Sequence, residues 1–407
     1  MSDRTVRAIL DAQVSGFVAG MTKAATVAQD TGKKITDGID KASKSVKAHE
    51  QEWKTVSNGM LIGGAAIAGG LALSTKAAMD WEKAFAGVAK TVGLTDPGLK
   101  ALEGDLRGLA REMATSHEEI AQVAESAGAL GVKTQDIAGF TKTMLMLGET
   151  TNLSADQAAT SLAQLMTIMG TAPSMVGRMG ATLVALGNNG ASTEAQIVQL
   201  SQRIAAAGRQ MGMSESQVMG FASAIASTGV EVEAGGTAMS QGLIKISAAV
   251  REGGDGLKTL SAVAGVDFKK AFEQDAAGAT TAFIEGLGKL QKQGGDVDAV
   301  LSAIGIDGIR GADTFKRLAL SGGLLAEQLQ VANTGMRDGT ALLDAYAARQ
   351  GTASAKVAVA LNNVKDAGIS FGAQFLPVVA NVANAATNMA QGFGNLPGPM
   401  QAFIGTG

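Results

Sequence analysis

The chain has 407 residues, with 34 basic and 37 acidic side chains and a net charge near −3, so we expect no specific nucleic-acid site, which would need concentrated positive charge. It contains no cysteine, which excludes disulfide bonds and thiolate metal sites, and only two histidines. Hydrophobic residues make up 46% of the chain but aromatic residues only 4%, and 54 residues are glycine. Such small side chains favour closely packed helices over one thick core.

The N-terminal part, residues 1–56, carries a seven-residue pattern. Its first residues lack the layout of a secretory signal, so we expect synthesis in the cytoplasm. From Val14 to Met60, apolar or small residues alternate at spacings of four and three, the 3.5-residue period of a left-handed supercoil. Both a self-associating coiled coil and an amphipathic helix that docks on its own chain fit this pattern. The predicted self-association seam contains Val14, Val18, Met21, Ile35, Ile39, Val46 and Trp53.

A Gly/Ala-rich apolar segment follows at residues 57–77, and no charged residue lies between Lys54 and Lys76. Small residues recur at the four-residue spacing that lets helices approach closely in lipid. The strictly apolar stretch is shorter than the ~20 residues that span a bilayer as a helix. A membrane-seeking segment and a close-packed helix inside an assembly both remain open. The candidate membrane residues are Met60, Leu61, Ile62, Ile67, Leu71 and Leu73.

The sequence predicts that residues 78–250 form a core of short helices. Four capping boxes, each a Ser or Thr followed three positions later by Glu or Gln, predict helix starts because each side chain can satisfy a free backbone N–H. Glycines about one helix length further on predict helix ends. The capping boxes are Ser116/Glu119, Ser154/Gln157, Thr193/Gln196 and Ser214/Gln217. The predicted stops are Gly131, Gly148, Gly170 and Gly229.

An internal repeat within this core indicates helical hairpins. Leu130–Glu149 matches Met211–Val230 at an offset of 81 positions, with coincident glycines and with Phe140 aligned to Phe221. A duplication explains this match, although chance similarity in so Gly/Ala-rich a chain is the alternative.

Two further parts complete the chain. Residues 251–332 open with a predicted loop at Arg251–Leu260 and continue as a second helical subdomain with Gly turns. Residues 333–407 contain a long helical stretch, which must break or kink at Pro377, and a Pro/Gly-rich end. The predicted fold class is therefore all-α: an N-terminal long, coiled-coil-like helix, then short packed helical hairpins, then a long C-terminal helix.

No constellation of catalytic residues emerges, so we expect no enzyme, cofactor or metal site. His49 lies on the seam, and the neighbours of His117 are explained by helix capping. Gly305–Gly311 resembles a phosphate loop, but no strand precedes it and no Gly-Lys-Ser/Thr follows, so it predicts a helix–turn–helix junction. The lysines of residues 33–54 alternate with acidic residues, which indicates a solvated helix face. Four methionines are predicted to be core residues: Met144, Met146, Met166 and Met169.

Several motifs occur in the order typical of one family. They are an aromatic-Glu-Lys-Ala-Phe helix start at Trp81–Phe85, a Leu-Gly-Val turn at Leu130–Val132, the helix with Phe140, and a Leu-Gly-Glu-Thr-Thr-Asn-Leu-Ser turn at Leu147–Ser154. Ala185–Ser240 and Leu361–Asn384 continue the similarity. Over roughly residues 78–400 the chain resembles the TP901-type core region of phage tail tape measure proteins, whereas residues 1–77 match only in style.

The resemblance implies a structural protein of the virion tail lumen, around which tube subunits polymerise and whose length sets tail length. It also implies help with genome ejection across the host envelope. The implied partners are the tail tube protein, tail assembly chaperones, tail tip proteins and other copies of the chain, with possible contact to the host membrane. Relatives continue beyond the position of Gly407 into long ruler segments, so we expect either a truncated product or a chain without the measuring portion.

A second hypothesis comes from a different class: a membrane-active helical protein whose Met60–Leu73 segment inserts to form a pore. A third, a cell-wall hydrolase, lacks a credible acid–base pair in the sequence.

Overall fold

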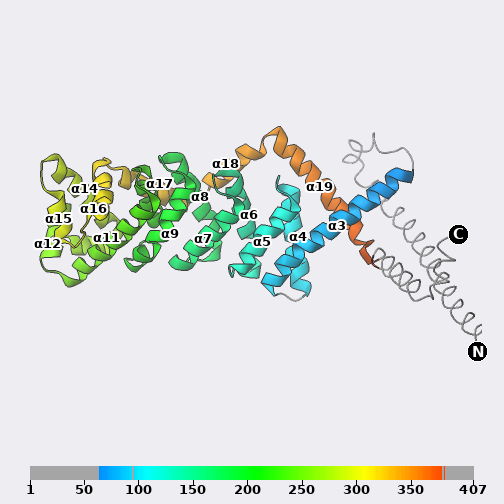
Figure 1. Ribbon diagram of the computed structural model, residues 1–407, viewed down its shortest axis with the longest axis horizontal. Helices are drawn as coiled ribbons and strands as arrows, with labels where there is room; N and C mark the ends of the chain where they lie inside the picture. Colours follow the sequence, from blue (N-terminus) through cyan, green and yellow to red (C-terminus); the bar gives the residue numbers. More distant parts are fainter. Residues whose placement is uncertain (1–63, 94–95, 378–379, 381–407) are drawn as a thin grey trace, which may run out of the picture. The chain divides into compact units, whose positions relative to one another are not determined.

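The computed structural model describes residues 64–93, 96–377 and 380, and all their regular secondary structure is helical, which confirms the predicted all-α class (Figure 1). The α-helices are α3 (Gly64–Val92), α4 (Asp96–Glu112), α5 (His117–Ala129), α6 (Thr134–Thr150), α7 (Ala155–Met169), α8 (Val176–Asn189), α9 (Glu194–Gln210), α10 (Glu215–Ser227), α11 (Val232–Glu252), α12 (Gly254–Ala264), α13 (Phe268–Gln274), α14 (Ala276–Lys292), α15 (Val297–Ala303), α16 (Ile309–Leu320), α17 (Leu324–Asp338), α18 (Ala341–Gln350) and α19 (Ala353–Ala373). A short 3-10 helix, η1 (Pro173–Met175), precedes α8.

The chain divides into two compact units, residues 1–83 with 364–407, and residues 84–363. In the first unit, Gly372 of α19 approaches the backbone of Ser74 in α3 so closely that a Cβ atom would not fit. α19 ends at Ala373, four residues before Pro377, because the proline ring clashes with the carbonyl at that distance. The predicted break therefore falls at residues 374–375, and Pro377 itself is helical. The five-part domain division stays a prediction.

In the second unit, helices α4 to α16 pack mainly on near neighbours in the chain. α5 contacts α6 and α7, α7 contacts α9, α9 contacts α10 and α11, and α11 contacts α12 and α16 (Figure 1). The interior consists of many medium-sized and small side chains, among them the four methionines predicted to be core residues. Phe140, Phe221 and Phe283 are the larger anchors, each at most 2% exposed. A succession of thin cores therefore replaces one thick core, as the composition predicts.

The end of this unit runs back along the helices that precede it. We call residues 324–363 the return segment. Within it, α17 packs against α8 and α10, and α18 packs against α6 and α8. Farther along, the Asn362 side chain donates hydrogen bonds to the carbonyl oxygens of Met113 (3.0 Å) and Thr115 (2.7 Å). The segment thus contacts progressively earlier helices, so residues more than one hundred positions apart share one core.

Most predicted helix boundaries are confirmed. Ser154, Thr193 and Ser214 each form the complete reciprocal capping box, while Ser116 only accepts the N–H of Glu119. Of the predicted stops, Gly131, Gly170 and Gly229 have φ values of 72° to 80° and follow helix ends. The predicted junction at 305–311 separates α15 from α16.

The two copies of the internal repeat form the same turn. Gly131 and Gly212 both have φ +80°, and the aligned Phe140 and Phe221 are both buried. In each copy, the N–H of the residue after this glycine donates to the carbonyl oxygen five positions earlier. This is the hydrogen bond of a Schellman motif. These bonds are Val132 N–H to Ala127 O (3.1 Å) and Met213 N–H to Gly208 O (2.9 Å). The same bond also follows α7, α14 and α15, so the duplication stays a prediction.

Three sequence expectations differ from the structure. Gly148 does not end α6 but lies in its last turn, where its missing Cβ makes room for Ala155. The predicted loop at Arg251–Leu260 is almost entirely helical, since a single residue, Gly253, separates α11 from α12. The long helical stretch after Asn333 is divided into α17, α18 and α19, with Gly339 in the left-handed conformation that ends α17.

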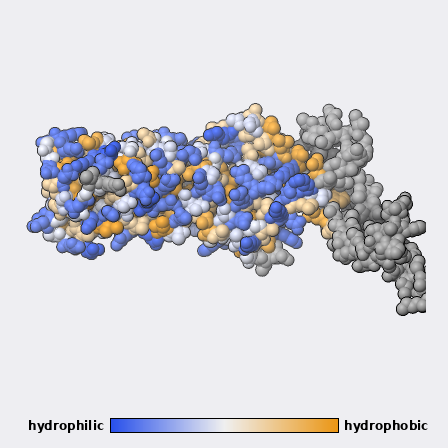
Figure 2. All heavy atoms as spheres, in the orientation of Figure 1, coloured by the Kyte–Doolittle hydropathy of each residue, from blue (hydrophilic) through white to orange (hydrophobic). Residues whose placement is uncertain are grey.

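Part of α19 is apolar and exposed. Val357, Leu361 and Val364 are 59%, 63% and 41% exposed, and their spacing of four and three places them along one helix face. Hydrophobic colour marks the region of α19 in Figure 2, whereas hydrophilic colour predominates over much of the visible surface of the preceding helices.

Candidate functional site

The sequence-predicted association residues lie largely outside the described part of the chain. This holds for the whole predicted seam and for Met60, Leu61 and Ile62. Ile67, Leu71 and Leu73 lie in α3, where Leu73 is 66% exposed. Among the helices that the structure describes, none is both long and apolar enough to cross a bilayer.

Of the two histidines considered for chemistry, the structure describes one. His117 is fully buried as the first residue of α5. His49 lies outside the described residues. Within residues 64–93 and 96–377, no group of three His, Asp or Glu side chains is placed to hold a metal ion. Two surface grooves beside α17 have the shape of a binding site.

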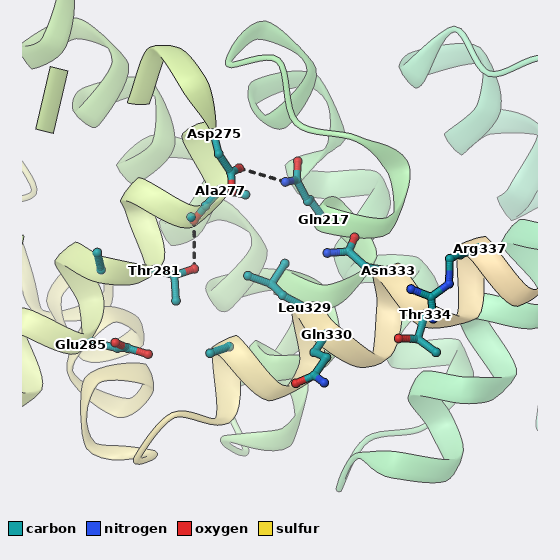
Figure 3. Close-up of a pocket in the computed structure, with 13 residues that line it drawn as sticks. Gln217, Asp275, Ala277, Thr281, Glu285, Leu329, Gln330, Asn333, Thr334 and Arg337 are labelled. Carbon is teal, nitrogen blue, oxygen red and sulfur yellow. Dashed lines mark hydrogen bonds between the residues drawn. The ribbon is translucent and has the colours of Figure 1, made fainter. Parts of the chain in front are cut away.

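The larger groove has a volume of about 600 Å³ and lies between α14 and α17 (Figure 3). The buried residues Ala277, Thr281 and Leu329 lie deepest. Around them the lining includes Gly278, Ala282 and Ala326, whose side chains are small or absent. The groove exists because these small residues leave the space between the two helices unfilled.

Polar bonds fix one end of the groove. The Gln217 side chain bonds at both ends: its oxygen accepts the N–H of Ser214 in the capping box, and its Nε2 donates to Asp275 Oδ1 at 2.9 Å (Figure 3). Next to it, Ser216 Oγ donates to Asn333 Oδ1 at 2.7 Å. Because α10 supplies both contacts, it holds the start of α14 and the middle of α17 in place.

Charge is distributed unevenly along this groove. Glu285 and Arg337 lie near opposite ends (Figure 3). Arg337 Nε donates to Asp338 Oδ1 at 2.9 Å, and this bond raises the pKa of Arg337. In contrast, neither Asp275 nor Glu285 forms a salt bridge with a residue that the structure describes. The α14 wall therefore presents two uncompensated carboxylates.

A second groove of about 420 Å³ lies between α17 and α8 and extends to the start of α18. Gln330 and Thr334 line both grooves, so they form a ridge between them. The charged residues lining the second groove are Glu327 and Asp338. The two grooves together form one surface, which we call the α17 face, in which carboxylates outnumber the single basic side chain.

Beneath the α17 face, a buried polar cluster holds α17 on its neighbours. The fully buried Gln328 side chain accepts a hydrogen bond from Ser223 Oγ (2.8 Å) and donates one to the carbonyl oxygen of Asn189 (2.9 Å). Both buried polar ends of the amide are thereby satisfied, which avoids the cost of an unpaired buried group. Position 328 thus fixes the rotation of α17 about its axis and the residues that α17 exposes.

The α17 face is not predicted by the sequence patterns described above. Its walls come mainly from α8, α14 and α17, which are not consecutive in the chain, and no local pattern specifies that α17 returns to α8 and α10. Two helical glycines were the available signal, because Gly220 and Gly335 lie where α17 approaches α10 and α8 most closely. Glycine within a helix is costly unless close packing requires it.

Comparison with known proteins gives one match: residues 104–305 are similar to the family of phage-related minor tail proteins. No curated protein and no solved structure matches the chain. The matched range runs from α4 through α15 and contains the α14 wall of the larger groove, whereas α17 lies beyond it. This similarity supports a phage tail protein with a structural role.

Proposed function

We propose that this chain is the N-terminal part of a phage tail tape measure protein, a scaffold in the tail lumen that organises tube assembly and assists genome passage into the host. The observation that carries the proposal is the match of residues 104–305 to phage-related minor tail proteins. The ordered motifs between Trp81 and Ser154, which resemble the core region of tape measure proteins, support it further.

In this proposal the protein acts by packing helices and not by catalysis. Close helix contacts made by Gly, Ala and Ser position polar surfaces for other tail proteins, and no side chain takes part in a reaction. The buried contacts of α17 illustrate the principle, since they fix which residues the helix presents to a partner.

The folded unit is better suited to binding other tail proteins than to setting tail length. A continuous helix converts each added residue into ~1.5 Å of length, but a chain folded into short packed helices gains far less. Helices α4 to α18 have 7 to 21 residues each. We therefore assign residues 96–350 to organising the assembly and not to setting length.

Affinity capture from cells that produce the phage tests this function. The tagged full-length chain should retain the tail tube protein, tail assembly chaperones or tail tip proteins, identified by mass spectrometry. A matched chain with Gly220→Leu, which cannot seat α17, should retain them less. Absence of every tail protein from the captured material would contradict the proposal.

The pore-forming alternative is less favoured. Its candidate segment is partly described, as the start of α3, and no described helix has the length and apolar character of a membrane span. Binding of the full chain to liposomes, measured by co-sedimentation, distinguishes this function from a tail scaffold.

A further inference from the structure

The α17 face combines negative charge with unfilled space. Five ionisable side chains line its two grooves, and one pair, Arg337 and Asp338, is internally bonded. The remaining three, Asp275, Glu285 and Glu327, are carboxylates that make no salt bridge within the described residues. Asp275 and Glu285 are ten positions apart, and a helix advances ~1.5 Å per residue, so they lie roughly 15 Å apart along α14.

This face fits a ligand that is basic and has small side chains. The floor of the larger groove at Ala277, Gly278 and Ala282 offers room without bulky neighbours. Lysine has a flexible stem and a point charge, so it can reach carboxylates at either side while a slim backbone occupies the groove. Opposite charges across such a surface raise the association rate and select the partner.

One segment of the chain has this composition. Lys41–Lys47 reads Lys-Ala-Ser-Lys-Ser-Val-Lys, with three lysines, no acidic residue and otherwise small side chains. No other window of seven residues in the sequence has three basic residues without an acidic one. This run lies outside the described residues.

We propose that the α17 face binds the run Lys41–Lys47 of a second copy of this chain. The ammonium groups of Lys41, Lys44 and Lys47 pair with the carboxylates of Asp275, Glu285 and Glu327, and Ala42 and Ser43 lie over the small residues of α14. The contact joins one copy to the next through dissimilar surfaces, an arrangement that propagates from copy to copy. This inference is independent of the tail function proposed above.

Disulfide trapping tests the contact directly, because the chain has no cysteine of its own. Two full-length variants are mixed under mild oxidation: Ser43→Cys in one and Ala282→Cys, in the groove, in the other with a tag of different mass. We expect the mixed disulfide to form at least tenfold faster than with Ser302→Cys, an exposed position on α15 that serves as the control. The three cysteine variants should have equal helix content by circular dichroism.

Charge dependence separates docking from random collision. Adding Glu285→Gln to the groove variant should slow trapping about tenfold, and raising the ionic strength should slow it as well, because salt screens exposed charges. Exchange of the exposed Asp255 for Asn should leave the rate unchanged. Equal trapping at positions 282 and 302, or no effect of Glu285→Gln, would overturn the proposal. So would a double variant, Ser43→Cys with Ala282→Cys, that cross-links only within single chains.

Discussion

Tyr346, the one tyrosine of the chain, lies in a polar cluster that joins α18 to the end of α6. Gln350 Nε2 donates to Tyr346 Oη at 2.7 Å and to Glu149 Oε2 at 3.2 Å. Burial, and then the negative charge of Glu149, raise the pKa of the Tyr346 phenol well above its usual value, although the Gln350 bond opposes them. The phenol is therefore expected to stay neutral in the folded protein at pH values where a free tyrosine ionises.

A spectrophotometric titration of the phenolate checks this expectation. Because the folded pKa is raised, the contribution of Tyr346 to stability is complete below the ordinary tyrosine pKa of ~10 and is lost as the pH rises above it. In the native chain the phenol should ionise only at a higher pH than a free tyrosine does. In Glu149→Gln it should begin at lower pH. An ionisation midpoint near 10 with the fold intact would contradict the half-buried position of the phenol beside Glu149.

A second residue-scale prediction compares two glycines that occupy equivalent positions in the internal repeat. A Cβ at Gly220 would lie 3.1 Å from Leu329 Cα and 3.2 Å from the carbonyl oxygen of Gln328, both in the backbone of α17. A Cβ at Gly139 would meet nothing within 4 Å. Gly220→Ala should lower the free energy of unfolding by ~1–3 kcal/mol through overpacking.

The matched variant Gly139→Ala should instead raise the free energy of unfolding by up to ~1 kcal/mol, because alanine favours the helix. Chemical denaturation followed by circular dichroism measures both changes. Equal effects of the two substitutions would show that α17 does not pack on α10 as described.

At the scale of single elements, the attachment of α17 depends on Gln328. Gln328→Ala removes the fully buried amide that accepts the Ser223 hydroxyl and donates to the Asn189 carbonyl oxygen, and the buried Ser223 Oγ keeps only its contact with Ser192 Oγ. The free energy of unfolding should fall by ~1–3 kcal/mol, since the loss of a buried hydrogen-bond partner costs about that much. Gln330→Ala, on the exposed ridge of the same helix, should change it by at most ~0.5 kcal/mol. Similar denaturation midpoints for both variants would contradict the buried position of Gln328.

Local sequence signals predict individual helices well and their partners poorly. Capping boxes at Ser154, Thr193 and Ser214 locate helix starts because a cap is formed by residues three positions apart. Glycine alone is ambiguous: Gly131 ends a turn, whereas Gly148 permits close packing inside α6. The return of α17 onto α8 and α10 depends on contacts between residues more than one hundred positions apart, which no local pattern encodes.

At the scale of the whole molecule, the proposed role is that of a helical scaffold whose surfaces organise other tail proteins. The family similarity covers the region in which helices pack on near neighbours, and the return segment then joins distant parts of this region. Removing part of the unit exposes buried faces along its length, because each thin core is shared between successive helices. Shortening the unit should therefore abolish assembly and not produce proportionally shorter tails.

Electron microscopy of particles from a phage that carries an in-frame deletion of residues 134–169, which removes α6 and α7, tests the scaffold role most directly. We expect heads without tails, or tails that fail to assemble, and restoration by the intact chain supplied in trans. Particles with tails of normal number, length and infectivity would contradict it.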